Sequence, residues 1–141
     1  MLSIVEIEIV TKLVIAAILG MLVGLERELH HKPAGMRTHV LVCIGATLFA
    51  IISTSIKGDL VDTSRIASSV VLGIGFLGAG IIFKEADKIK GLTTAAELWV
   101  LAAIGLAVGI GFYFTAIATT TIVLLILVPG KIMEKNIKKR R

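Results

Sequence analysis

Long apolar runs separated by short polar segments dominate the chain. A membrane-spanning helix needs roughly 17–25 mostly apolar residues. Runs of this length predict five transmembrane helices, which cover residues 5–25, 38–56, 66–83, 93–109 and 112–129. One continuous helix over 93–129 would be about 55 Å long, against a hydrocarbon core of ~30 Å. We therefore predict a tight turn at Gly109-Ile110-Gly111 between the last two spans.

The composition agrees with a membrane protein. Of the 141 residues, 56% are hydrophobic and 18% are charged, whereas a soluble domain averages about 25% charged residues. Disordered chains are charged and poor in aliphatic residues, so disorder is excluded as well. The single cysteine, Cys43, excludes a disulfide framework and a Cys-rich metal site. The predicted fold class is all-α, a polytopic membrane bundle over 1–130 followed by a basic tail over 131–141.

The distribution of Lys and Arg predicts the orientation of the bundle, because cytoplasmic loops of membrane proteins are enriched in these residues. In a five-span topology one side carries twelve of them: Arg27, Lys32, Arg37, Lys84, Lys88, Lys90, Lys131, Lys135, Lys138, Lys139, Arg140 and Arg141. The other side carries Lys57 and Arg65. We expect the N-terminus outside and the C-terminus in the cytoplasm. The N-terminus has no basic region of the kind that precedes a cleaved signal peptide, so we expect the first span to be retained.

The formal net charge of +5 raises the question of nucleic acid. The tail over 131–141 carries this whole excess, which favours a membrane surface over a nucleic-acid partner. The segment Gly73 to Gly78, GIGFLG, matches the dinucleotide fingerprint G-x-G-x-x-G, but that motif requires a preceding strand. Here it lies in the middle of a span, so we expect neither nucleotide nor nucleic-acid binding.

Small residues mark candidate helix contacts, because they allow transmembrane helices to approach closely. The third span presents small residues on two faces, with Gly73, Gly75, Gly78 and Gly80 as the candidate packing positions. We expect this helix to be central and contacted on both sides, in a homodimer or larger assembly. The pairs Gly20/Gly24 and Gly105/Gly109 are further small-residue contacts.

The first candidate site follows the first span, in the sequence GLERELHHKPAGMRTH over 24–39. Glu26 and Glu28 are about 200° apart on a helix and cannot bind one ion together. Thr38 is positioned to cap the next helix. An ion pair of Glu26 with Arg37, next to Arg27, would clamp the first two spans together, and a hydrated ion site is the alternative.

The second candidate site is GLTTAAELW over 91–99. Thr94 and Glu97 have the spacing of a capping box at the start of the fourth helix. Glu97 is also one turn inside a span, where an acidic side chain is a functional candidate. We expect one polar cluster at the cytoplasmic membrane edge, with the following candidate members: Glu26, Arg27, Glu28, Arg37, Thr38, His39, Thr93, Thr94 and Glu97. Glu26 and Glu97 are the candidate Mg²⁺ ligands, and no other cofactor is expected.

At these two sites the chain resembles the membrane domain of the MgtC/SapB family. The resemblance rests on GLERELHHKPAGMRTHVLVCIGATLF, GIGFLGAGIIFK and GLTTAAELWVLAAIG and runs from about residue 10 to residue 128. Met36 stands where leucine is expected, and Glu97 stands where a small or hydroxyl residue is expected. Many members carry a soluble C-terminal domain, which we expect to be absent here.

The resemblance implies a multi-pass protein of the bacterial inner membrane that is linked to growth at low Mg²⁺ and to restraint of the proton-driven ATP synthase. It leaves two functions open. One is a regulator that acts through membrane partners, and the other is a pathway for Mg²⁺ or a small solute. An enzyme is not expected, because the sequence holds no H-E-x-x-H, no G-x-S-x-G and no pair of membrane aspartates.

Overall fold

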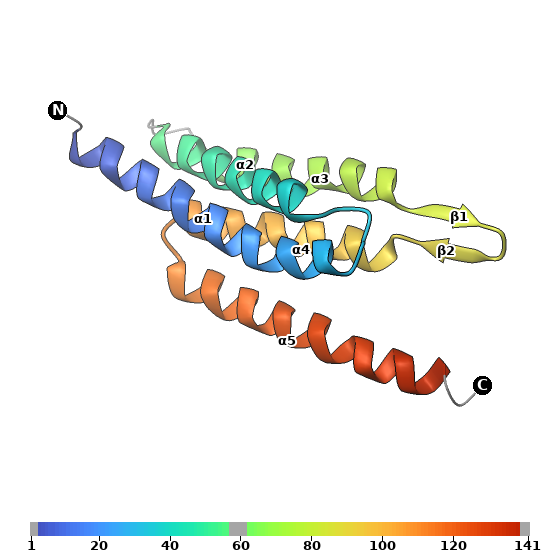
Figure 1. Cartoon of the computed structure of the whole chain (residues 1–141). Coiled ribbons are helices and arrows are strands. Elements are labelled where there is room, and N and C mark those ends of the chain that lie inside the picture. Colours follow the sequence, from blue (N-terminus) through green and yellow to red (C-terminus); the bar gives the residue numbers. More distant parts are fainter. Residues whose placement is uncertain (1–2, 57–61, 139–141) are drawn as a thin grey trace.

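The computed structural model describes residues 3–56 and 62–138, with side chains as far as Val128. Five helices and one β-hairpin follow each other along the chain (Figure 1). Their bounds are α1 Ile4–Leu29, α2 Met36–Ser55, α3 Ser64–Ile81, β1 Phe83–Glu85, β2 Lys88–Lys90, α4 Leu92–Gly109 and α5 Tyr113–Lys138. The predicted all-α membrane bundle is thereby confirmed in its five helices.

Four of the helices, α1 to α4, are long and apolar enough to cross a membrane, and α5 is apolar over Tyr113–Val128. The predicted turn between the last two spans is confirmed: α4 ends at Gly109 and α5 begins at Tyr113. Gly111 has a φ of 88°, a left-handed conformation that glycine adopts without steric cost. The chain therefore reverses direction within three residues.

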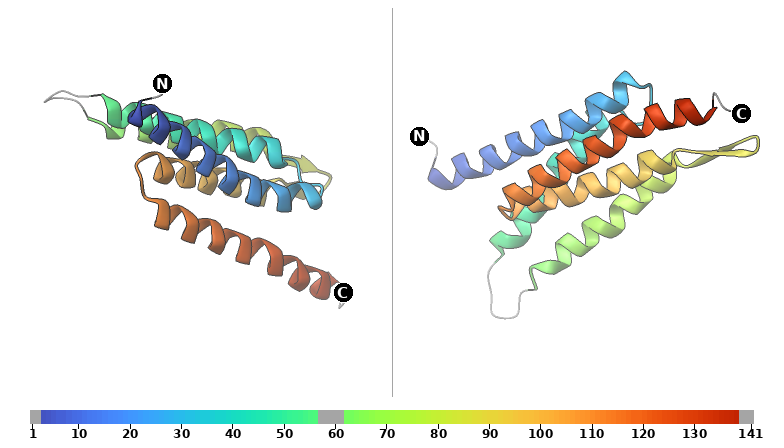
Figure 2. Two further views of the ribbon diagram at one scale, coloured as in Figure 1. Left: turned by 60° about the vertical axis from the view of Figure 1, so that its left-hand side comes forward. Right: turned by 90° about the horizontal axis from the view of Figure 1, so that it is seen from below.

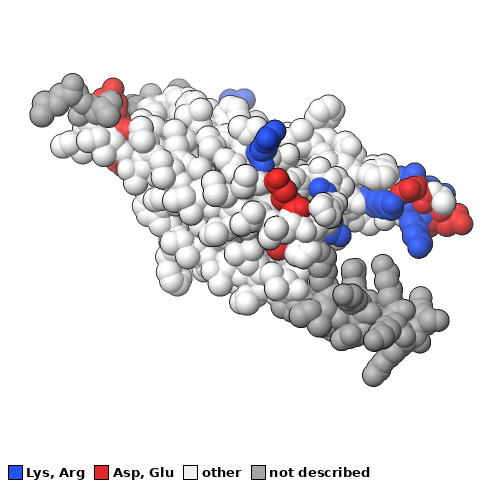
Figure 3. Space-filling view, in the orientation of Figure 1, with Lys and Arg blue, Asp and Glu red and all other residues white. Residues whose placement is uncertain are grey.

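Successive helices run in opposite directions, so the polar connections gather at two ends (Figures 1 and 2). One end holds the C-terminus of α1, the N-terminus of α2, the β-hairpin and the C-terminus of α5. Lys and Arg side chains lie over the hairpin at this end (Figure 3). We call it the basic end, and it is the side that the charge count predicts to be cytoplasmic.

The β-hairpin is a feature that the sequence analysis missed. Its two strands are antiparallel, with Phe83 opposite Lys90 and Glu85 opposite Lys88. Ala86 has a φ of 51° and makes the turn, and Lys90 forms an ion pair with Glu85. Both strands have only three residues, and every one of them is exposed. They show no hydrophobic alternation, so the sequence pattern contained no signal for them.

Cysteine labelling should confirm the predicted orientation. In a Cys43→Ala background, we expect Leu60→Cys to react with a membrane-impermeant maleimide in intact cells. Lys32→Cys and Lys88→Cys at the basic end should react only after the cells are opened, because excess positive charge is retained in the cytoplasm. The reverse labelling pattern would contradict the orientation.

The tightest helix contacts surround α2, which packs against both α1 and α4. A Cβ atom added at Gly24 of α1 would lie 2.7 Å from the Met36 Cα atom and 2.8 Å from the His39 Cβ atom. A Cβ atom added at Gly105 of α4 would lie 2.9 Å from the Ala46 Cβ atom. These separations are too short for a side chain, so glycine is required for α1 and α4 to approach α2.

The expected central position of α3 is wrong within one chain. In the chain as described, α3 buries only Ile74 and Gly78, and Cβ atoms added at Gly73, Gly75 or Gly80 would meet nothing within 4 Å. Gly78 alone has a neighbour, the Ala95 Cβ atom at 3.5 Å from its added Cβ. The helix is peripheral because α2 fills the position between α1 and α4, and packing of the open glycines against a second copy stays a prediction.

The exposed Asp62 lies at the start of α3 and holds the first residue of that helix. The Asp62 carboxylate accepts a hydrogen bond from the Ser64 backbone N–H at 2.9 Å and one from the Ser64 hydroxyl at 2.6 Å. These hydrogen bonds hold the pKa of the exposed Asp62 carboxyl below its ordinary value. The residue needs no further role.

Candidate functional site

Hydrogen bonds of the backbone and of Glu28 form the turn between α1 and α2, which contains the first predicted site. His31 has a φ of 50°, and its N–H donates to the Glu28 carbonyl at 3.0 Å. The Glu28 carboxylate accepts the Met36 backbone N–H at 2.9 Å, at the start of α2. Thr38 was expected to cap this helix and does not, because the helix begins at Met36 with Gly35 as its N-cap. Glu28, eight residues upstream, satisfies the free N–H instead.

Three charged side chains are buried where α1 meets α4 at the basic end. The exposed fractions are 7% for Glu26, 3% for Arg27 and 6% for Glu97. Arg27 Nη1 donates to Glu26 Oε2 at 3.1 Å, and Arg27 Nε lies 2.7 Å from Glu97 Oε2. The second contact is close but poorly aligned, so Arg27 Nε and both Glu97 oxygens lack a well-formed hydrogen bond. The guanidinium is thus shared between two carboxylates of different helices.

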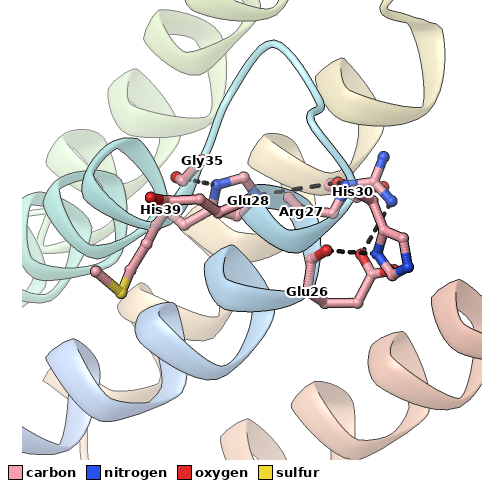
Figure 4. A network of polar contacts seen from close by, with 8 residues as sticks. Glu26, Arg27, Glu28, His30, Gly35 and His39 are labelled. Atoms are coloured by element: carbon pink, nitrogen blue, oxygen red, sulfur yellow. Dashed lines mark hydrogen bonds and ion pairs between the residues drawn. The ribbon is translucent and has the colours of Figure 1, made fainter.

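His39 of α2 completes this group, and its side chain is fully buried. Its Nδ1 lies 2.9 Å from the Gly35 carbonyl oxygen, and its Nε2 lies 3.9 Å from Glu97 Oε2. Figure 4 shows Glu26 and Arg27 at the end of α1 beside His39 at the start of α2. We call Glu26, Arg27, His39 and Glu97 the charge cluster. It joins three helices, and buried charges are tolerated only when they are compensated in this way.

His30 extends the cluster toward the surface. About one third of its side chain is exposed, and its Nδ1 lies 2.6 Å from the Glu26 carbonyl oxygen and 2.8 Å from Glu26 Oε1. Because Nδ1 faces a carbonyl, it carries a hydrogen. His30 therefore contacts Glu26, whereas the histidine that faces Glu97 is His39.

The structure brings together only part of the predicted set. Glu26, Arg27, His39 and Glu97 form the charge cluster, and Thr94 is buried on the same helix as Glu97. Glu28, Arg37 and Thr93 are exposed. Thr38 lines an apolar hollow of about 360 Å³ between α2, α3 and α4. The expected clamp through Arg37 is wrong: Arg27 makes the ion pairs, because it is on the buried face of α1.

The capping box at Thr94 and Glu97 is also wrong. Gly91 is the N-cap of α4, with a φ of 89° and no side-chain cap. The Glu97 carboxylate points to Arg27 instead of its own helix start. Sequence analysis also missed the Gly35 carbonyl as the partner of His39, since a backbone acceptor leaves no mark in the pattern of side chains.

The charge cluster does not fit the Mg²⁺ site expected at Glu26 and Glu97. Mg²⁺ requires octahedral oxygen ligands and retained waters, whereas the cation between these two carboxylates is Arg27. Within 3–56 and 62–128, where side chains are described, no three His, Cys, Asp or Glu residues are grouped so that they could hold a metal ion. We assign no metal to the cluster.

The sequence is similar over most of its length to one family of known proteins. The MgtC family matches residues 13–136. The chain is 42% identical to "Putative magnesium transporter YhiD" of Escherichia coli K12, over 92% of this chain and 66% of YhiD. It is 47% identical to "Protein MgtC" of Brucella abortus (strain 2308), over 77% of this chain and 45% of that protein. It is 34% identical to "Protein SapB" of Bacillus subtilis, over 94% of this chain and 65% of SapB.

No solved structure matches the chain at a significant level. The chain spans less than two thirds of the length of each of these relatives: 66% of YhiD, 45% of MgtC and 65% of SapB. The match to the family over residues 13–136 nevertheless covers α2, α3 and α4, most of α1 and α5, and the whole charge cluster. The chain belongs to the MgtC family.

Proposed function

We propose that this membrane protein acts in Mg²⁺ homeostasis as a regulator that works through a membrane partner, with the proton-driven ATP synthase as the partner that the family resemblance implies. We place it in the bacterial inner membrane. The observation that carries the proposal is the interior of the bundle, which is packed with side chains and does not continue the polar character of the basic end.

The middle of the bundle is filled by apolar side chains. Leu101, Ile104 and Val108 of α4 are buried with Val23 of α1. Thr47 is a polar side chain that is also buried, and its hydroxyl lies 2.9 Å from the Cys43 carbonyl and 2.8 Å from the Gly105 carbonyl. A hydroxyl committed to the backbone of two helices supports packing. This interior favours a regulator over an ion pathway.

The surface supports an action through partners. Gly73 and Gly75 of α3 are exposed along the helix, and exposed glycines allow a second transmembrane helix to approach closely. The residues of the charge cluster lie near the end of α1 and the starts of α2 and α4, at the same end of the bundle as the hairpin. A regulator that acts through a membrane partner needs a lateral face that a partner helix can approach, and it can respond through charged groups at one membrane face. The chain has both features.

A Mg²⁺ transporter is the alternative, and one observation favours it. Glu97 Oε1 is buried without a hydrogen-bond partner among the described residues, so the cluster has acceptor capacity beyond Arg27. The name of the YhiD relative also refers to magnesium transport. The two functions differ in whether Mg²⁺ crosses the bilayer.

Flux and proton-pumping measurements should separate these functions. In proteoliposomes that contain the purified chain, we expect Mg²⁺ uptake no faster than in protein-free liposomes, because the bundle interior is apolar. In inverted membrane vesicles, we expect ATP-driven proton pumping to fall when the chain is present. Vesicles from cells without the chain provide the control.

Mg²⁺ uptake that is abolished by Glu26→Gln but retained in Arg37→Gln would replace the regulator with the transporter. Arg37 is the matched control because it is charged, near the same helix end and exposed. Unchanged proton pumping together with absent Mg²⁺ uptake would contradict the ATP synthase as the partner.

A further inference from the structure

One of the two ring nitrogens of His39 has a hydrogen-bond partner, and the other faces a carboxylate that it contacts poorly. A carbonyl oxygen only accepts hydrogen bonds, so the Nδ1 atom that faces the Gly35 carbonyl at 2.9 Å must carry a hydrogen. In a neutral imidazole the Nε2 atom is then a bare acceptor. That atom is buried without a hydrogen-bond partner among the described residues and faces Glu97 Oε2, a second acceptor, at 3.9 Å. Two buried acceptors that face each other repel unless a hydrogen lies between them.

The charge balance of the cluster also favours one additional proton. Glu26 and Glu97 contribute two negative charges and Arg27 one positive charge, so the cluster has a net charge of −1 when His39 is neutral. An uncompensated buried charge is strongly unfavourable. One additional proton brings the cluster to neutrality.

Among the side chains described for the neighbouring helices α1, α2 and α5, no other group supplies this charge at Glu97. On α1, Glu28 is exposed and its carboxylate accepts the Met36 N–H, while His30 lies on the Glu26 side. On α2, Arg37 is exposed. Among the side chains described for α5, over 113–128, none is charged. His39 is therefore the group placed to compensate Glu97.

We propose that His39 and Glu97 form a buried proton-binding site, in which the proton is carried on His39 Nε2 and donated toward Glu97 Oε2. Proton uptake converts the neutral imidazole to imidazolium and changes the charge of the cluster from −1 to zero, and no other bond is made or broken. The charge-assisted hydrogen bond, about 2.7–2.9 Å long when formed, joins α2 to α4. Release of the proton leaves α4 held to the cluster by Arg27 alone.

Nitrogen NMR of the full chain, with ¹⁵N-labelled histidine and in lipid bilayers, tests this site. At about pH 7.5 a histidine in water is mostly neutral. We expect His39 at this pH to show two protonated ring nitrogens. A variant with both His30→Gln and His31→Gln leaves His39 as the sole histidine, so its signal is assigned directly. The four residues of the charge cluster are unchanged in this variant.

Glu97→Gln should return His39 to a neutral imidazole with its hydrogen on Nδ1, because the substitution removes the charge that the proton compensates. Glu85→Gln on the exposed hairpin is the matched control and should leave the His39 signal unchanged. A neutral His39 in the folded wild-type chain at about pH 7.5 would overturn the proposal, as would an imidazolium that persists in Glu97→Gln.

Thermal unfolding across pH gives a second reading that does not depend on assignment. Loss of the proposed proton would leave His39 Nε2 and Glu97 Oε2 as two facing acceptors, so the proposal requires the folded state to lose stability as the pH rises. We expect the melting temperature of the wild type to fall with rising pH by more than that of His39→Gln. Parallel curves for the two proteins would contradict a proton bound at His39.

Discussion

Replacement of Gly105 with leucine is expected to prevent the bundle from folding. The first added atom would lie 2.9 Å from the Ala46 Cβ atom and would also overlap the Cys43 carbonyl oxygen, so the backbones of α2 and α4 would have to separate. Overpacking in a close-packed interior costs about 1–3 kcal/mol and occasionally more. Since leucine adds four carbons at a backbone contact, we expect a loss of at least ~3 kcal/mol, measured by thermal unfolding and size-exclusion chromatography in detergent.

Gly73→Leu and Gly75→Leu are the matched controls for Gly105→Leu. They make the same change on the open side of α3, where an added Cβ atom meets nothing within 4 Å. We expect both variants to fold, and a reduced molecular size in either would indicate that α3 contacts a second copy. A Gly105→Leu variant that purifies with the size and melting temperature of the wild type would contradict the packing of α2 against α4.

Arg27→Gln is expected to destabilise the chain by about 3–5 kcal/mol, because removal of one partner from a buried ion pair leaves an uncompensated buried charge. Here Glu26 and Glu97 would both lose the guanidinium that lies between them. Arg37→Gln removes the same charge from an exposed position, and we expect its effect to stay within about 0.5 kcal/mol. The measurement is the free energy of unfolding in detergent micelles.

The double variant Arg27→Gln/Glu97→Gln distinguishes a charge effect from lost packing. It removes one positive and one negative charge, so we expect it to be more stable than Arg27→Gln alone. The difference between the double variant and the sum of the single variants gives the coupling of the two residues. Additive single effects would mean that Arg27 supports the bundle through the contacts of its alkyl chain and not through Glu97.

The amino-acid sequence by itself determined the number of helices, their approximate bounds and the reversal at Gly109-Ile110-Gly111. These features depend on the length of apolar runs, on the thickness of a bilayer and on the conformational freedom of glycine, all of which are local properties. The depth of a residue in its span follows from the same runs. For this reason Glu26, Arg27, His39 and Glu97 could be expected at one end of the bundle before their contacts were known.

Only the tertiary structure decided which faces of the helices meet. In a soluble helix the polar face marks the solvent side, but α2 and α4 face either protein or lipid and are apolar on nearly all sides. The sequence therefore carries little information about the rotation of each helix around its axis. That rotation buries Arg27 and exposes Arg37, brings Gly24 and Gly105 against α2, and leaves Gly73 open. Packing is the main contact between helices in lipid. The rotation of each helix therefore depends on where small residues of different helices fit together. Such a fit involves two segments of the chain, so it cannot be derived from one apolar run.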